Sequence, residues 1–464
     1  MKKRIFTKCF LAVAMALMCF GVARAGDKAE PASKAAASEK NVAQEILDIL
    51  RANNQITAQQ YDALLAKAKA EEAKPQGGDA KHTPGALRVF WKDGVNFEGG
   101  DDTPIKFQIG GYLQTDWAYT NGDKKLEAKF GKSSSGVEFR RARIAMGGSL
   151  YDTVDYKLEY DFATGVPKIL DAYLQVNDLP WVGTTRVGNV KEPFGLNQLM
   201  SDKYDAFMES PSMQDTFIPK RNVGILVQNT AFDKRMTWAL GGFRQTDDVG
   251  KGFGPDAMYN LTGRLSGLPW YEEQGRQLVH VGLSYSHRFR NNDPVSFSVR
   301  PEAHLAPVLV NTGNIVSDGV NLLNPELAVV YGPFAVQAEY TKAMVETPKG
   351  KGNGLDFSGY YVEASYFLTG ENRNYKTAAG TFGLTSPKHN FDGHGNWGAF
   401  EVATRYSALN LNDQKVHGGR LTGITTGVNW YLNPSMRLMA NYNVAHRNTF
   451  GDLNVLQVRA QLLF

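Results

Sequence analysis

Cysteine is missing from nearly the whole of this chain, because both of its cysteines, Cys9 and Cys19, lie in the first 25 residues. Those residues have a basic start, an apolar run of about 14 residues and a small-residue exit at Ala25, which is the pattern of a secretory signal peptide. The run is shorter than the roughly 20 residues that a membrane-spanning helix needs. We therefore predict cleavage after Ala25 and an exported protein without thiols, disulfides or cysteine-ligated metal.

An excess of charge of either sign is missing as well. The whole chain has 51 Lys and Arg against 47 Asp and Glu, and residues 1–25 hold five of the bases and none of the acids, so 46 against 47 remain. Residues 87–464 hold 38 of each kind. Overall basicity gives no argument for nucleic-acid binding, and any attraction of anions must come from local clustering of bases.

Long apolar runs and catalytic motifs are the third absence. No stretch of about 18 apolar residues follows residue 25, so no transmembrane helix is expected. The sequence has no Gly-x-Ser-x-Gly, no P-loop and no Ser–His pair in the context of a nucleophile elbow. His389 and His394 flank Asp392 in a glycine-rich segment, where an exposed loop is a better interpretation than a weak metal site. We predict no enzymatic activity, no cofactor and no metal.

What the sequence does contain is a repeated alternation of apolar and polar residues. In the last strand-like segment every second residue from Leu456 to Phe464 is apolar, and Gln457, Arg459 and Gln461 alternate with them. A strand of this kind that ends on an aromatic residue resembles the terminal strand of outer-membrane barrels. A polar average is expected of such a barrel, because only every second residue of each strand meets lipid.

Seventeen segments share this pattern and are close to the length of about 9–11 residues that a bilayer strand needs. They are 105–120, 137–150, 154–164, 168–177, 185–192, 224–232, 236–245, 258–267, 277–289, 295–305, 321–331, 334–346, 356–369, 397–411, 420–432, 436–447 and 454–464. Single-chain bacterial barrels close with an even number of strands. We therefore predict an all-β fold, a transmembrane antiparallel β-barrel of 16 or 18 strands over residues 87–464. A soluble β-sandwich is the alternative, and it would have no apolar band facing lipid.

The connections between these segments differ in length. Two are tight, at 332–333 and 433–434, and the long ones, rich in Gly, Pro, Asn and Thr, are 193–223, 246–257, 306–320, 347–354 and 371–395. Outer-membrane barrels have short periplasmic turns and longer external loops. We predict the same arrangement here.

The segment before the barrel has a different pattern. Residues 26–40 have too little apolar surface to fold and are expected to be a linker. Residues 41–74 have the spacing of two short amphipathic helices, with Thr57 as the N-cap of the second. Their apolar stripes are Val42, Ile46, Ile49 and Leu50, and Tyr61, Leu64 and Leu65. Such helices need a partner for their stripes, so we predict a periplasmic helical segment that docks on other subunits, contacts the cell wall or remains a disordered tether.

Five separated motifs follow one another in the strand region. They are Glu138-Phe-Arg-Arg-Ala-Arg-Ile144, Lys157-Leu-Glu-Tyr-Asp-Phe162, Asp171-Ala-Tyr-Leu174, Lys191-Glu-Pro-Phe-Gly195 and Gly370-Glu-Asn-Arg373. Residues 105–464 thereby resemble the phosphate-selective porin O and P family. The resemblance implies a homotrimer of 16-stranded barrels in the outer membrane, each narrowed by an inward-folded third loop at about 193–223 with a basic constriction that selects anions.

The same resemblance implies pore roles for particular residues. It makes Arg140, Arg141 and Arg143 pathway residues, Lys191 the constriction lysine and Asp171 a possible acidic neighbour. Adjacent residues of a strand point to opposite faces, so Arg140 can join the other two arginines only at a bulge or bend.

Three further bases complete the predicted pathway. Lys220 and Arg221 end the long segment 193–223, and Arg244 follows in the next strands. Guanidinium and ammonium groups can replace the water that an oxyanion loses in a narrow pore. We expect passive diffusion of small anions such as phosphate, with outer-membrane lipid and lipopolysaccharide as surroundings and no nucleic acid as partner. The alternatives are a weakly selective porin and a structural barrel tethered to the cell wall through residues 41–74.

Overall fold

The computed structural model divides the chain into two compact units, residues 1–81 and 82–464. It describes residues 87–464 apart from 93, 100–103, 253–257 and 351, and in the first unit it describes Arg51, Thr57 and Tyr61. The predicted signal peptide and most of the predicted helical segment lie outside the described residues. The Tyr61 amide donates a 2.9 Å hydrogen bond to the Thr57 carbonyl four residues earlier, as in the first turn of an α-helix.

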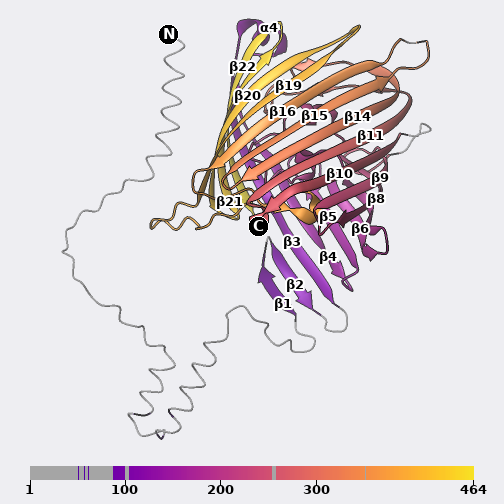
Figure 1. Cartoon of the computed structure of the whole chain (residues 1–464). Coiled ribbons are helices and arrows are strands. Elements are labelled where there is room, and N and C mark those ends of the chain that lie inside the picture. The colour runs from indigo at the N-terminus through magenta and orange to yellow at the C-terminus, as the bar shows by residue number, and fades with distance from the viewer. Residues whose placement is uncertain are drawn as a thin grey trace, which may run out of the picture. The chain divides into compact units, whose positions relative to one another are not determined.

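Sixteen antiparallel strands form a closed barrel, in which each strand pairs with the next along the chain and the last pairs with the first (Figure 1). They are β3 (Ile105–Gly122), β4 (Ser135–Leu150), β5 (Val154–Asp161), β6 (Lys168–Leu179), β7 (Gly183–Lys191), β8 (Arg221–Ala231), β9 (Met236–Arg244), β10 (Tyr259–Glu272), β11 (Gln277–Val295), β14 (Ile315–Tyr331), β15 (Phe334–Glu346), β16 (Leu355–Phe367), β19 (Ala399–Asp413), β20 (Val416–Asn433), β21 (Met436–Arg447) and β22 (Gly451–Leu463). The predicted fold class is confirmed, with 16 strands rather than 18.

The barrel closes along β3, whose edge is shared by two partners. β22 pairs with residues 112–122 of β3. β1 (Arg88–Trp91) and β2 (Val95–Gly99) form a hairpin, and β2 pairs with residues 105–109 of β3. Between these two partners, Gly111 and the terminal Phe464 exchange backbone hydrogen bonds of 2.6 and 3.0 Å. Every wall strand is therefore paired on both sides, as a barrel in hydrocarbon requires.

Alternation puts the two kinds of side chain on opposite faces of the wall. In β22 the side chain of Leu462 is exposed on the outer face, whereas Gln457, Arg459 and Gln461 are buried inside the barrel. β21 repeats the pattern. An apolar outer face is the one that lipid can cover. Among the described residues no helix has both the length and the apolar character to cross a membrane.

One predicted wall strand is wrong. Val295, Phe297 and Val299 of the segment 295–305 alternate as in a wall strand, but all three are buried in an interior cluster. The wall strand β11 ends at Val295, and beyond it β12 (Ser298–Val299) pairs with β13 (Val310–Asn311) inside one long loop, residues 296–314. The segment does alternate, but its apolar side chains pack in a hydrophobic core inside the barrel instead of facing outward. Seventeen candidates therefore give 16 wall strands.

The predicted side of one long connection is also wrong. Residues 368–398, between β16 and β19, lie at the same end of the barrel as the tight turns 332–333 and 434–435. This segment contains β17 (Tyr375–Lys376), η3 (Thr377–Ala379) and β18 (Thr381–Phe382), and η2 (Glu273–Gly275) lies at the same end. Each strand runs from one end of the barrel to the other, so successive connections must lie at alternate ends. Long connections only tend to lie at the external end. We call this end the turn side and the opposite end, which carries α4 (Lys124–Phe130), the loop side.

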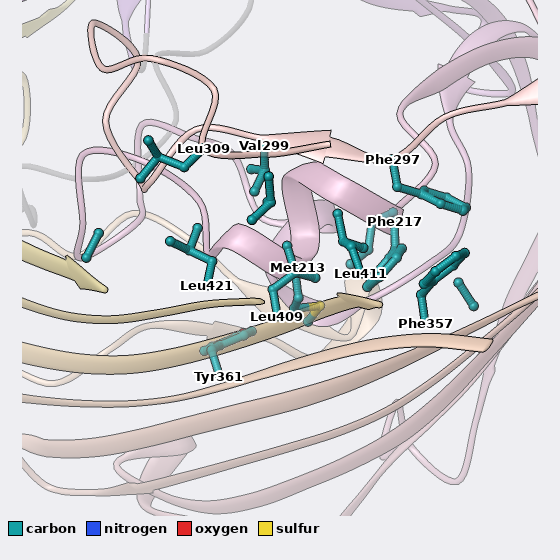
Figure 2. Close-up of a cluster of buried hydrophobic side chains, with 14 of the residues drawn as sticks. Met213, Phe217, Phe297, Val299, Leu309, Phe357, Tyr361, Leu409, Leu411 and Leu421 are labelled. Atoms are coloured by element: carbon teal, nitrogen blue, oxygen red, sulfur yellow. The ribbon is translucent and has the colours of Figure 1, made fainter. Parts of the chain in front are cut away.

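Three connections fold into the barrel and pack mainly against β14 to β22, which we call the filled half. They are residues 192–220, with α5 (Leu196–Leu199) and α6 (Ser212–Phe217), residues 296–314 and residues 368–398. Figure 2 shows Met213 and Phe217 of α6 packed among Phe297, Phe357 and Tyr361. Apolar side chains therefore occupy inward positions of β16, where a water-filled barrel would have polar ones, because a loop covers that wall.

Candidate functional site

The loop of residues 192–220 turns into the barrel at the Lys-Glu-Pro-Phe-Gly motif. Gly195 has a φ of +75°, which glycine adopts without strain, and a Cβ there would lie 2.9 Å from Oε2 of Glu339. The carboxylate of Glu339 in β15 accepts hydrogen bonds from the amides of Leu196 and Asn197, at 3.0 and 2.9 Å. The motif thus directs the loop across the lumen to the opposite wall.

Three buried arginines on that opposite wall hold the loop. Arg437 of β21 donates to the carbonyl of Asp205 at 2.7 Å, and Arg405 of β19 donates to the carbonyl of Glu209 at 2.7 Å. Arg459 of β22 pairs with the Glu209 carboxylate at 2.8 Å, and it also pairs with a carboxylate of β3. None of the three lines either of the two large cavities. We therefore assign them to the fixing of the loop.

The rest of the lumen, mainly along β4 to β11, is open as two cavities, and we call it the open half. One lies toward the loop side and has a volume of about 920 Å³, and the other lies toward the turn side and has about 750 Å³. The residues that line both cavities are Arg143, Lys191, Asp202 and Arg221. The cavities meet at these three bases and one acid, which we call the junction.

A β-bulge brings all three arginines of β4 into the lumen. Gln114 of β3 pairs with Arg141, but the next residue, Thr115, pairs with Phe139, so Arg140 is the extra residue of the bulge. This is the irregularity that the sequence requires if Arg140 is to face inward. The Arg140 guanidinium makes two 2.8 Å hydrogen bonds with the carboxylate of Glu209 in the inward-folded loop.

Arg141 and Arg143 share one carboxylate, which the loop supplies. Asp202 Oδ2 lies 3.1 Å from Nε of Arg141 and 3.0 Å from Nη1 of Arg143. Arg141 also donates to Gln114 at 2.8 Å, and Arg143 donates to Asp161 at 2.8 Å. The Asp202 carboxylate is thus a second link, beside Glu209, between the loop and the arginines of β4.

Two carboxylates of the loop, Asp202 and Glu209, are held in their ionised form. Burial alone would raise the pKa of Asp202, but Arg141 and Arg143 outweigh burial and hold this pKa well below its ordinary value. Burial would likewise raise the pKa of Glu209, and Arg140 and Arg141 hold it below its ordinary value. The junction therefore keeps one negative charge at physiological pH.

Lys191, the predicted constriction lysine, faces the junction and also holds the loop. Its Nζ donates to the carbonyls of Gln198 and Met200 at 2.6 and 2.9 Å. No carboxylate among the described residues lies within 4.0 Å of it. Its direct partners are therefore backbone carbonyls, and the carboxylates of Asp202 and Asp171 act on its charge from a longer distance.

Arg221 and Asp171, both in the predicted set, are paired with each other. Arg221 Nε lies 2.6 Å from Oδ1 of Asp171, and Lys157 Nζ lies 2.5 Å from Oδ2 of the same carboxylate. Asp171 is thus the acidic neighbour of Arg221 and Lys157. Lys157 lines the turn-side cavity next to the junction.

The last two residues of the predicted set lie elsewhere. Lys220 is exposed and lines the loop-side cavity. Arg244 lines neither cavity, and its guanidinium lies 5.1 Å from the ring centroid of Tyr259, an exposed residue of β10. Arg244 alternates with Phe243, which is buried inside the barrel. Arg244 is therefore on the outer face, because nearness along the chain does not fix the face of a strand.

Other bases of the cavity walls are outside the predicted set. They are Lys168, Arg288, Arg290 and Arg300 on the loop side and Lys157, Arg186, Arg264 and Lys376 on the turn side. Strand alternation places Arg186 and Arg288 on the polar face of their strands, so the sequence could have predicted that they face the lumen. Lys376 could not be predicted in this way, because it reaches the cavity only through the inward folding of residues 368–398.

Bases outnumber acids on both cavities although the barrel region is neutral overall. Ten Lys and Arg line the loop-side cavity with eight Asp and Glu, and seven line the turn-side cavity with four. A cleft lined by an excess of one sign attracts ions of the opposite sign. Bases therefore cluster locally around the two cavities, although the barrel region as a whole has no net charge.

The acidic residue between His389 and His394 has a structural role in the loop. Asp392 accepts hydrogen bonds from the amides of His394 and Asn396 at 2.7 and 3.1 Å, which closes a loop turn. Within the part of the chain that the structure describes, no three His, Cys, Asp or Glu side chains are grouped as metal ligands.

Comparison with known proteins agrees with this geometry. Residues 107–464 match the family model described as phosphate-selective porin O and P. Porin O of Pseudomonas aeruginosa is 25% identical over 447 residues, covering 87% of this chain and 96% of that protein. An uncharacterized protein of Caulobacter vibrioides is 29% identical over 394 residues, covering 82% of this chain and 74% of that one.

A solved structure shows the same fold at low identity. An anion-selective porin from Comamonas acidovorans superposes with a TM-score of 0.50 at 14% identity, covering 78% of this chain and 100% of that one. The family match spans nearly the whole barrel, and the barrel has the closed wall of an outer-membrane porin. This chain therefore belongs to the phosphate-selective porin O and P family of outer-membrane porins.

Proposed function

We propose that this porin conducts small anions by passive diffusion and that phosphate and related oxyanions are its preferred solutes. The family and the fold indicate a channel rather than an enzyme. The observation that carries the proposal is the junction, where Arg143, Lys191 and Arg221 line both cavities together with a single acid. An anion there exchanges hydration water for guanidinium and ammonium donors.

Bases on either side of the junction support a pathway of several sites. Arg288 and Arg290 line the loop-side cavity, and Arg186 and Lys376 line the turn-side cavity. Conduction needs several moderate sites in series, because one tight site would trap the ion. The word phosphate in the family description, and the anion selectivity named for the porin from Comamonas acidovorans, support the choice of solute.

The proposal includes an orientation and an assembly. We assign the loop side to the exterior and the turn side to the periplasm, with outer-membrane lipid and lipopolysaccharide around the apolar outer face. Three copies are proposed to form the working porin. A cell-wall contact through residues 41–74 would lie on the periplasmic side.

A weakly selective porin is the second candidate, because most bases near the junction have acidic partners. Arg143 lies beside Asp161, and Arg221 lies beside Asp171. Eight acids also line the loop-side cavity. Such mixed charge would allow cations to pass as well.

The test is the zero-current potential of the purified wild-type channel in a gradient of potassium chloride across a planar bilayer. The proposal expects the sign of chloride preference, and it expects phosphate to reduce the chloride current. A potential near zero favours the weakly selective porin, and the opposite sign overturns the anion pathway. A bilayer that stays sealed would support the tethered structural barrel.

A further inference from the structure

The carboxylate of Asp202 lies between the guanidinium groups of Arg141 and Arg143. It belongs to the loop segment between α5 and α6, and it is the one acid that lines both cavities. Its side chain is 29% exposed, whereas those of its partners Arg141 and Arg143 are 6% and 10% exposed. Of these three groups, the carboxylate is thus the one most open to the water of the cavities.

We propose that Asp202 is a resident counter-ion that competes with the permeating anion for Arg141 and Arg143 and thereby sets how tightly the channel holds phosphate. This inference rests on the proposed function, because it names the residue that limits affinity on the same pathway. Carboxylate and phosphate oxygens accept the same charge-assisted hydrogen bonds from guanidinium groups. A carboxylate tethered to the wall competes at a high effective concentration.

The loop backbone is fixed on both sides of Asp202, so only the side chain needs to move. On one side Lys191 donates to the carbonyls of Gln198 and Met200 at 2.6 and 2.9 Å. On the other side Arg437 donates to the carbonyl of Asp205 at 2.7 Å. An anion can therefore displace the carboxylate without opening the loop.

Arg141 and Arg143 differ in the partners that they keep when the Asp202 carboxylate moves away. Arg143 keeps Asp161 at 2.8 Å, whereas Arg141 keeps only the neutral amide of Gln114 at 2.8 Å among its described partners. The guanidinium of Arg141 is therefore the group that Asp202 chiefly withholds from phosphate. Arg141 lines the loop-side cavity, from which an incoming anion would reach it.

The experiment measures phosphate block of the chloride current through single channels of the full-length protein, with wild type and Asp202→Asn compared. Asp202→Asn keeps the size of the side chain and removes its charge. We expect the half-blocking phosphate concentration to fall by about tenfold and the chloride preference to increase. Asp356→Asn is the matched control, because Asp356 is exposed and pairs with Lys342 away from both cavities, at 2.8 Å. It should leave the block unchanged.

A second variant tests the partner as well as the site. If Asp202 acts by occupying Arg141, the gain from Asp202→Asn should disappear in an Arg141→Gln background. A gain that persists there contradicts the assignment of Arg141. If Asp202→Asn fails to assemble, Asp202→Ser applies the same test with a smaller neutral side chain.

The outcomes separate this inference from the proposed function. An anion-selective wild type whose block changes by less than about twofold in Asp202→Asn overturns the inference and leaves the anion pathway intact. A wild type that prefers potassium and is not blocked by phosphate overturns the proposed function, and the inference with it.

Discussion

The two halves of the barrel interior contain the same kinds of residue and use them differently. On the filled half, Arg405, Arg437 and Arg459 bind the loop and are almost completely buried. On the open half, Arg143 and Arg221 line both cavities. The difference lies in what surrounds each guanidinium. A base that is buried against a packed loop and lines no cavity is out of reach of a solute. An inward-facing arginine is therefore not by itself evidence for an ion pathway.

The largest expected effect comes from removing an arginine of the filled half. Arg459→Met would leave the buried carboxylate of Asp116 without its arginine, whereas Glu209 would keep Arg140. Removing one partner of a buried ion pair costs about 3–5 kcal/mol. We expect the variant to lose the heat-resistant folded form in gel electrophoresis and to unfold at lower denaturant concentration. Arg420→Met, at an exposed arginine of β20, should behave as wild type. Equal stability of both variants would contradict the division between the halves.

The second effect should appear in conduction and leave the fold intact. Arg221→Gln removes one of three bases at the junction, while Asp171 keeps Lys157 at 2.5 Å. We expect the half-blocking phosphate concentration to rise by about tenfold and the chloride preference to fall. Thermal unfolding should match wild type, and a variant that unfolds early would place Arg221 with the anchors of the filled half.

A weaker, salt-dependent effect is expected on the turn side. Arg186 and Lys376 line the turn-side cavity, and no carboxylate of the described chain lies within 4.0 Å of either. The double variant Arg186→Gln with Lys376→Gln should lower chloride conductance by about twofold at low salt, and the loss should vanish near 1 M salt, where screening extends over only about 3 Å. A loss of the same size at both salt concentrations would mean that the residues shape the pore rather than attract ions.

The smallest effect is expected from a base on the outer face. Arg244→Gln should change neither the zero-current potential nor the phosphate block, because Arg244 covers Tyr259 and lines neither cavity. A clear drop in chloride preference would contradict this assignment and would mean that Arg244 belongs to the anion pathway, as the sequence predicted.

Most of the wall could be predicted from the sequence because alternation is local. In β22, the polar face of Gln457, Arg459 and Gln461 follows directly from a period of two. The bulge at Arg140 follows from the same rule, since three arginines at 140, 141 and 143 share one face only if the register shifts.

The interior could not be predicted, because it depends on contacts between segments far apart in the chain. Phe297 alternates like a wall residue and packs against Phe217 and Phe357 in a core inside the barrel. Lys376 reaches the turn-side cavity only because residues 368–398 fold inward. Arg459 and Arg143 look alike in the sequence, and only the course of the loop separates an anchor from a junction residue. The end of the barrel at which residues 368–398 lie could have been predicted. Counting the connections along the sequence already places that segment on the turn side.

The most direct test of the difference between the two halves is to locate anions in crystals. Bromide soaked into crystals of the porin can be placed by its anomalous scattering. We predict bromide in contact with Arg143, Lys191 and Arg221, and none beside Arg405, Arg437 or Arg459. Bromide among the filled-half arginines, or an empty junction at high bromide concentration, would contradict the account.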